Sequence, residues 1–154
     1  MTDEEGVPDL RDPLSGLLTQ AYFDVAVPER VAVARRGLRP LSLVLVRSSA
    51  GQLRSSERAA LVRACLRASD TACQLGRDEL GLILEDTPED GAVWTAERLR
   101  RDLEAAGDDV VVWAGVATYP AHTLDAAGLV SAAIQALEQA TAWPGSRIEV
   151  ARPS

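Results

Sequence analysis

The chain has 154 residues, of which 47% are hydrophobic and 25% charged, a composition that suits one soluble globular domain. No apolar run approaches the roughly 18 residues of a membrane span, and the acidic N-terminus is unlike a secretory signal or a transit peptide, so we expect a cytoplasmic protein. The net charge of −7 argues against non-specific binding to DNA, RNA or an anionic membrane.

The first third of the sequence predicts an arm, a helix and a strand. Residues 1–13 are polar with two prolines, and we expect a flexible N-terminal arm there. Apolar residues then recur at helical spacing from Leu14 to about Gly37, with a break or kink expected at Pro28. The run PLSLVLV, Pro40–Val46, is rich in leucine and valine and predicts a buried strand.

A helix and a hairpin follow. Ser56 suits the N-cap of a helix over Glu57–Arg67. TACQLG (71–76) and ELGLILED (79–86) then predict two strands of a hairpin that turns at GRD.

The last third alternates helices and strands. Glu89 to about Ala105 predicts an amphipathic helix closed by Gly107, and 124–142 predicts an alanine-rich helix. Strands are predicted at 109–120 and 146–151. The order indicates a single α/β (α+β) domain over 14–152, with a central, mainly antiparallel sheet of about five strands flanked by helices.

Three residue types limit the chemistry. All 16 basic residues are arginine, which excludes a lysine phosphate clamp and leaves guanidinium groups that pair well with phosphate and guanine, although a GC-rich genome would give the same bias. Cys65 and Cys73 lie in apolar surroundings and are expected to be buried, inert thiols. His122 is the single histidine, so a catalytic triad or a histidine metal site has little support.

Several segments in a fixed order carry a family resemblance. DPLSGLLTQAYF (12–23), LGRDELGLILEDT (75–87), AERLRRDLE (96–104) and VWAGVATYP (112–120) together resemble the GGDEF domain, the diguanylate cyclase domain of bacterial cyclic di-GMP signalling. The resemblance implies a nucleotidyl-cyclase palm-like fold. It also implies, for active members, a reaction that joins two GTP molecules with the help of acid-bound Mg²⁺.

The signature of this family is degenerate here: it consists of Gly76, Arg77, Asp78, Glu79 and Leu80. In the family one metal-binding acid ends the first strand and another is the third signature residue. The first position is Arg47, whose cation would repel Mg²⁺, and only Asp78 remains. We therefore expect Asp78 and Glu79 to serve as turn and surface groups.

Other family features are also missing. Arg77 replaces a glycine that lets the backbone approach substrate phosphates, and Thr141 replaces a phosphate-contacting lysine. The segment between Arg47 and Gly76 is shorter than in the family and lacks its guanine-reading Asn and Asp. We expect no catalytic residue, no enzyme activity and no Mg²⁺ cofactor.

By contrast, an inhibitory-site pattern keeps its register. In product-inhibited members an RxxD motif begins nine residues before the first signature glycine, as Arg67 does here, with Asp70 completing the motif and Arg98 at the third position. The resemblance implies a cyclic di-GMP site, in which arginines meet phosphate or guanine and Asp70 accepts from the guanine edge. The simpler interpretation of Arg67 and Asp70 is a local ion pair at a helix end.

Three functions are therefore open. The first is a catalytically inactive receptor that binds cyclic di-GMP, forms a homodimer through the ligand and acts on an unidentified protein partner. The second is a nucleotide-independent protein–protein interaction module that uses Trp94, Trp113 or Trp143, although core packing is the commoner role for each. The third is weak GTP binding or residual cyclase activity.

Overall fold

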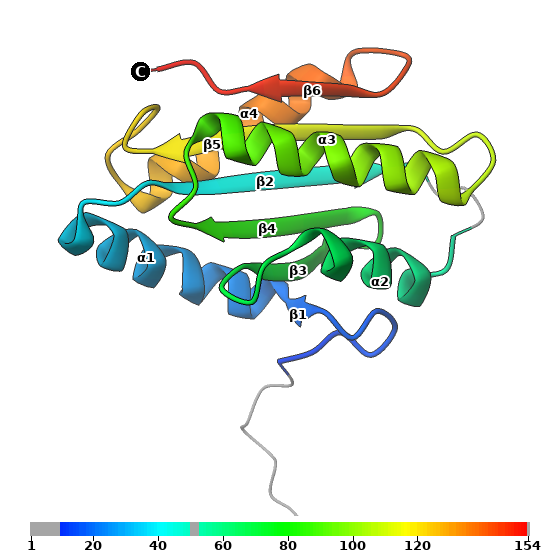
Figure 1. Cartoon of the computed structure of the whole chain (residues 1–154), viewed down its shortest axis with the longest axis horizontal. Coiled ribbons are helices and arrows are strands. Elements are labelled where there is room, and N and C mark those ends of the chain that lie inside the picture. The colour runs from blue at the N-terminus through cyan, green and yellow to red at the C-terminus, as the bar shows by residue number, and fades with distance from the viewer. Residues whose placement is uncertain (1–9, 50–52, 154) are drawn as a thin grey trace, which may run out of the picture.

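The computed structural model describes residues 10–49 and 53–153. Within them, six strands form one mixed sheet flanked by four helices (Figure 1). The strands are β1 (Leu18–Thr19), β2 (Leu41–Ser48), β3 (Thr71–Gly76), β4 (Glu79–Glu85), β5 (Val112–Tyr119) and β6 (Arg147–Val150). The helices are α1 (Gln20–Gly37), α2 (Ser55–Cys65), α3 (Glu89–Ala106) and α4 (Ala126–Thr141). The expected α+β arrangement is confirmed, with one short strand, β1, that the sequence pattern did not predict.

The sheet order is β1-β3-β4-β2-β5-β6. The inner pairs β3–β4, β4–β2 and β2–β5 are antiparallel, whereas the edge strands β1 and β6 run parallel to β3 and β5. The sheet is therefore mainly antiparallel, as predicted, but its two edges make it a mixed sheet.

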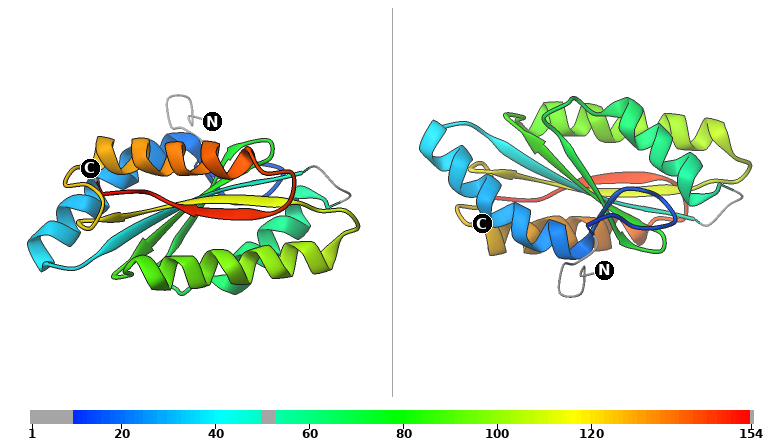
Figure 2. Two further views of the ribbon diagram at one scale, coloured as in Figure 1. Left: turned by 90° about the horizontal axis from the view of Figure 1, so that it is seen from above. Right: turned by 90° about the horizontal axis from the view of Figure 1, so that it is seen from below.

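Helices cover both faces of this sheet, with α2 and α3 on one side and α1 and α4 on the other (Figure 2). Because side chains alternate along a strand, β2 contributes Val44 to the core that contains Leu99 of α3. Its neighbours Leu43 and Leu45 enter the core that contains Val27 of α1. β2 is thus buried on both faces, which explains its continuous apolar sequence.

Close packing between β5 and α4 depends on one glycine. A Cβ atom at Gly115 would lie 2.3 Å from the backbone nitrogen of Leu137. Only a residue without a side chain allows the helix backbone to come this close to the strand.

The first helix differs from its prediction at one end. It begins at Gln20 rather than near Leu14, because Gly16 has a left-handed φ of 78° and Thr19 Oγ1 caps the first helical turn. Pro28 lies inside α1 without ending it, so a break at this position is wrong and a kink stays a prediction. Pro28 is exposed, and the carbonyl that loses its helical donor there can be hydrated.

The described end of the predicted arm lies beside β1. The backbone nitrogen of Thr19 donates to the Leu10 carbonyl at 3.0 Å, and Arg11 forms an isolated bridge with Leu18. Residues 1–9 fall outside the described part of the chain, so the arm and the boundary between residues 13 and 14 stay predictions.

The second helix positions the RxxD motif differently from the prediction. It begins at Ser55 with Arg54 as its N-cap residue, so the prediction of Ser56 as N-cap is wrong. The Glu57 carboxylate accepts the Arg54 backbone N–H at 2.9 Å. It ends at Cys65, so Arg67 lies in the loop between α2 and β3. α3 and α4 match their predicted spans closely, with Gly107 as the C-cap of α3.

Candidate functional site

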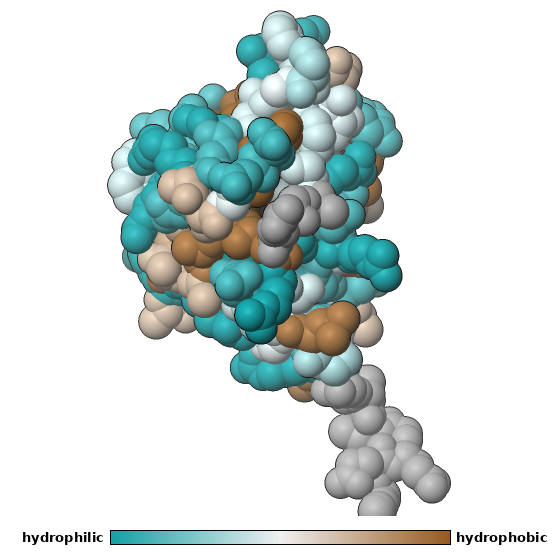
Figure 3. Space-filling view, turned by 90° about the vertical axis from the view of Figure 1, so that its right-hand side faces the viewer, coloured by the Kyte–Doolittle hydropathy of each residue, from teal (hydrophilic) through white to brown (hydrophobic). Residues whose placement is uncertain are grey.

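Arg47, where the resemblance places a metal-binding acid, forms an ion pair in the structure. Arg47 of β2 faces Glu79 of β4 in the antiparallel register. Arg47 Nε donates to Glu79 Oε2 at 3.0 Å, and its Nη2 donates to the same oxygen at 2.5 Å. Glu79 is therefore engaged by a cation rather than standing as a simple surface group. On this side of the molecule hydrophilic side chains surround smaller hydrophobic patches (Figure 3).

A second arginine lies against the turn between β3 and β4. Arg58 of α2 is only 4% exposed, and its Nη1 donates to the Arg77 carbonyl at 3.1 Å. Its Nη2 lies 4.0 Å from Asp78 Oδ1, while its buried Nε has no hydrogen-bond partner among the described residues. The burial of Arg58 was not predicted from the sequence, because an arginine on a helix normally indicates a face exposed to solvent.

These contacts bear on whether Asp78 and Glu79 could bind Mg²⁺. The acids Asp78 and Glu79 each have a guanidinium within 4.0 Å, so their charge is already compensated. In the described ranges there is no group of three or more His, Cys, Asp or Glu side chains that could hold a metal ion. Two acids that each lie against a guanidinium group make a weak donor set for a divalent cation.

The remaining signature residues have structural roles. Asp78 lies in the β3–β4 turn, as predicted, and its carbonyl accepts from the Ser48 backbone N–H at 3.1 Å. Leu80 is 1% exposed and belongs to the core, whereas Gly76 and Arg77 are exposed at the turn.

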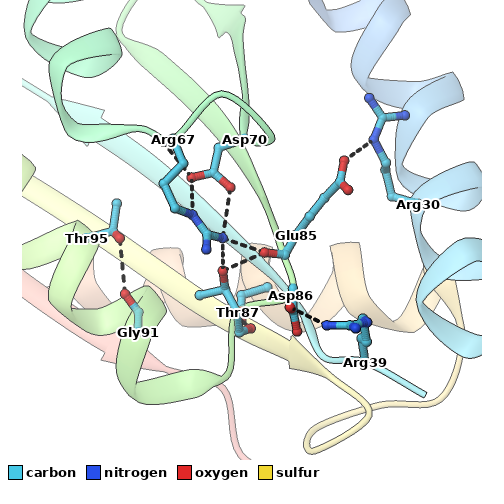
Figure 4. A network of polar contacts seen from close by, with 10 residues as sticks. Arg30, Arg39, Arg67, Asp70, Glu85, Asp86, Thr87, Gly91 and Thr95 are labelled. Carbon is cyan, nitrogen blue, oxygen red and sulfur yellow. Dashed lines mark hydrogen bonds and ion pairs between the residues drawn. The ribbon is translucent and has the colours of Figure 1, made fainter. Parts of the chain in front are cut away.

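The RxxD motif forms a compact loop at the other end of α2. Asp70 Oδ2 accepts the Arg67 backbone N–H at 3.0 Å, and both carboxylate oxygens lie 3.4 Å from the Arg67 guanidinium (Figure 4). The Asp70 side chain is only 5% exposed, but that of Arg67 is 58% exposed. Asp70 thus fixes the loop and orients an arginine that remains open to solvent.

The end of β4 and the loop before α3 hold the same guanidinium through further hydrogen bonds. Arg67 Nη2 donates to the Glu85 carbonyl at 2.5 Å and to Thr87 Oγ1 at 2.7 Å (Figure 4). The Glu85 carboxylate in turn accepts from Arg30 Nε of α1 at 2.9 Å. Arg67 is therefore held by contacts from two directions, which limits the conformational freedom that it would lose on binding a ligand.

A cavity of about 260 Å³ opens beside this arginine. Arg67, Asp70 and Thr87 line one part of it, and Gly91, Trp94 and Thr95 of α3 line another. Trp94 is 59% exposed, so an indole ring stands at the surface next to an arginine. From the sequence, Trp94 was predicted only as a candidate interface residue. Its place in the same cavity as Arg67 depends on how the chain folds between the two residues.

Arg98 lies further along α3, outside the lining of this cavity. Its Nε is 3.7 Å from Asp102 Oδ2, and both side chains are about two-fifths exposed (40% and 38%), which makes this a weak surface pair. Cys65, which lines the cavity, donates through Sγ to the same Asp102 at 3.6 Å. Arg67 and Asp70 thus contact each other directly, whereas Arg98 is connected to the cavity that they line through Asp102 and Cys65.

Both cysteines are buried free thiols, as predicted. Burial raises the pKa of Cys65 to about 11, against an opposing effect of the Arg98 charge. Burial likewise raises the pKa of Cys73 to about 12. Neither thiol is activated for chemistry.

His122 and two tryptophans have structural contacts. His122 is buried, its Nδ1 accepts from the Thr118 backbone N–H at 2.9 Å, and its Nε2 lies 3.0 Å from Glu89 Oε1. Trp113 is partly buried and its indole N–H donates to the carbonyl of Trp143, which is 48% exposed.

Comparison with known proteins identifies the family. Residues 55–146, more than half of the chain, match the family model described as "Diguanylate cyclase, GGDEF domain". A search of curated proteins gave no match. No helix in the described ranges is long and apolar enough to cross a membrane.

Solved structures match over almost the whole chain. The GGDEF domain of PA1120 (TpbB or YfiN) from Pseudomonas aeruginosa has a TM-score of 0.83 at 21% identity, covering 92% of this chain and 94% of that one. The GGDEF domain of DgcB from Caulobacter crescentus, in complex with c-di-GMP, has a TM-score of 0.78 at 15% identity, covering 93% and 96%. The cyclase SiaD of P. aeruginosa, in complex with its activator SiaC, has a TM-score of 0.81 at 20% identity, covering 93% and 62%. These matches establish the fold.

Proposed function

Because the chain belongs to the GGDEF domain family, we propose that it is a catalytically inactive member that binds cyclic di-GMP as a receptor. The observation that carries the proposal is the Arg67–Asp70 loop. In this loop hydrogen bonds hold the Arg67 guanidinium in place while the side chain stays exposed to solvent. Arg67 lines a cavity that is also lined by the exposed Trp94.

The charges around Asp78 and Glu79 support inactivity. Arg47 contacts Glu79, and Arg58 lies near Asp78, so two cations stand where phosphoryl transfer needs Mg²⁺. A Mg²⁺ ion at this place would have to displace both guanidinium groups against Coulomb repulsion. We expect no conversion of GTP to cyclic di-GMP.

The receptor site suits a dianionic dinucleotide. Arg67 and Arg98 can pair with phosphate or with the O6 and N7 atoms of guanine, and the exposed ring of Trp94 can stack on a base. In the absence of ligand, Asp70 orients the Arg67 side chain. We expect the Asp70 carboxylate to accept hydrogen bonds from the guanine edge only after its contact with Arg67 has loosened. Arg98 must exchange its weak pair with Asp102 for the ligand.

A receptor needs an output, and the family offers two routes. Cyclic di-GMP carries two guanine bases and two phosphates, so a ligand bound at this exposed loop can contact two copies of the chain and join them into a homodimer. The SiaD–SiaC complex shows that a relative of this fold binds a protein partner. We propose an unidentified protein partner whose binding changes when the ligand is bound.

Calorimetric titration of the purified protein tests the proposal. We expect a dissociation constant in the micromolar range or tighter, about −8 kcal/mol or more favourable. Incubation with GTP and Mg²⁺ followed by chromatography should yield no cyclic di-GMP. A flat titration at high ligand concentration rejects the receptor, and product formation rejects inactivity.

A nucleotide-independent interaction module is the second candidate. Its support is the exposure of Trp94 and Trp143, at 59% and 48%, since exposed tryptophans favour interfaces. A pull-down in which the partners are the same with and without cyclic di-GMP, together with a flat titration, would favour this function over the receptor.

A further inference from the structure

A second cavity, of about 340 Å³, lies on the other side of the Arg67–Asp70 pair. β1, the end of α2 and the α2–β3 loop form its walls, and Arg67 and Asp70 line both cavities. Its volume falls within the range of about 300–1,000 Å³ that is typical of small-molecule sites.

Two further arginines line this second cavity. Arg63, in the last turn of α2, is exposed and has no ion-pair or hydrogen-bond partner for its guanidinium in the described ranges 10–49 and 53–153. Arg11 approaches from the segment before β1, and its Nη1 donates to the Gly16 carbonyl at 2.8 Å. Because Asp70 is already paired with Arg67, the charge of Arg63 leaves positive charge in the lining of this cavity, on a protein whose net charge is −7.

The turn before β1 brings these arginines together. A Cβ atom at Gly16 would lie 3.1 Å from Arg63 Nη2, so the bare glycine gives the Arg63 guanidinium room above the turn. The Gly16 carbonyl also accepts a hydrogen bond from Arg11. The guanidinium groups of Arg11 and Arg63, which belong to segments far apart in the sequence, therefore both lie close to Gly16.

Most of the remaining lining is apolar. Leu17, Leu18 and Leu66 contribute aliphatic side chains to it, and Thr71 is the one uncharged polar residue among the lining residues. A mixture of guanidinium groups and aliphatic surface suits a ligand that has both phosphate and a flat base, because the phosphate pairs with arginine and the base covers apolar area.

We propose that this second cavity is a phosphate subsite in which Arg63 and Arg11 bind the same dinucleotide that contacts Arg67. The inference rests on the proposed receptor function and extends it by two residues outside the RxxD pattern. One ligand seated on Arg67 can reach both cavities, since that side chain forms part of each.

Titration of cyclic di-GMP into Arg63→Gln and Arg11→Gln variants tests the subsite. Arg36→Gln is the matched control, because Arg36 is also an exposed arginine in the last turn of a helix but lines neither cavity. Loss of a charge-assisted hydrogen bond should weaken binding about tenfold or more in each subsite variant, with a smaller dependence of the dissociation constant on salt. The control should bind like the natural protein. Thermal melts verify that each variant is folded.

The outcomes separate the two proposals. If the natural protein binds and Arg63→Gln binds equally well, the subsite is wrong while the receptor function stands. If the natural protein does not bind at all, the receptor function fails and the subsite fails with it. If Arg36→Gln weakens binding as much as Arg63→Gln, the effect is one of net charge, and the subsite is again wrong.

Discussion

Arg47 and Glu79 face each other on neighbouring antiparallel strands, and the guanidinium donates twice to one carboxylate oxygen. The pair places a cation at the position where the resemblance to active cyclases places a metal-binding acid. If a side-chain cation has replaced a bound metal here, the replacement has consequences for stability that can be measured without any nucleotide.

The first prediction concerns divalent cations. We expect Arg47→Asp to lower the free energy of unfolding by about 1 kcal/mol or more in the absence of metal, because it sets like charges opposite each other across two strands. Millimolar Mg²⁺ or Mn²⁺ should recover part of this loss, whereas the melting temperature of the natural protein should not depend on either ion.

Arg39→Asp is the control for this experiment. Arg39 pairs with Asp86 at 2.6 Å but lies far more open to solvent, with 65% of its side chain exposed. Its variant should lose little stability and gain none from Mg²⁺. A rise in the melting temperature of the natural protein with Mg²⁺ would contradict our account of the former metal site.

The second prediction concerns the buried Arg58. Arg58→Ala should destabilise the fold by about 2–4 kcal/mol, since it leaves a cavity and removes the donor to the Arg77 carbonyl. Arg58→Met should cost much less, because it fills the space and removes the unpartnered Nε. Chemical denaturation measures both, and equal losses in the two variants would show that the guanidinium itself is essential.

The sequence predicted the fold well because its strongest signals are local. The apolar run of β2 and the amphipathic pattern of α3 determine those elements regardless of their neighbours. It failed at β1, because two residues that pair with β3 leave no periodic signal. It also placed Arg67 on a helix, although the helix ends at Cys65.

The candidate site was predictable only in part. Motif register proposed Arg67 and Asp70 from their spacing to the signature and Arg98 from its place in the AERLR pattern, and these assignments stay predictions. The contacts of Arg58 with the hairpin turn and the position of Trp94 beside Arg67 depend on tertiary packing, which no spacing along the chain reveals.

The third prediction concerns Trp94. If a base stacks on its ring, Trp94→Ala should weaken cyclic di-GMP binding by about 1–3 kcal/mol. Addition of ligand should also change tryptophan fluorescence in the natural protein and less so in this variant. Trp143→Ala serves as the control, because Trp143 is similarly exposed but lines neither cavity. Equal affinities for both variants would exclude stacking on Trp94.

The fourth prediction concerns pH. The pKa values of Cys65 and Cys73 are raised by burial to about 11 and about 12, from an ordinary value of 9.0. The folded state therefore holds these protons more tightly than the unfolded state, and its stability should fall as the pH rises from about 9 towards 12. Replacement of both cysteines by alanine should make the free energy of unfolding less dependent on pH over that range. An unchanged slope would contradict the raised pKa values.

The central claim is tested most directly by titrating cyclic di-GMP into two arginine variants of α3 side by side. Arg98 and Arg101 lie on the same helix and neither lines a cavity. Arg98 occupies the position that the resemblance assigns to the inhibitory site and pairs with Asp102, whereas Arg101 is exposed and is not at that position. We predict that Arg98→Ala loses about 1.5–3 kcal/mol of binding free energy and that Arg101→Ala binds like the natural protein. Binding of undiminished affinity by Arg98→Ala would contradict the account.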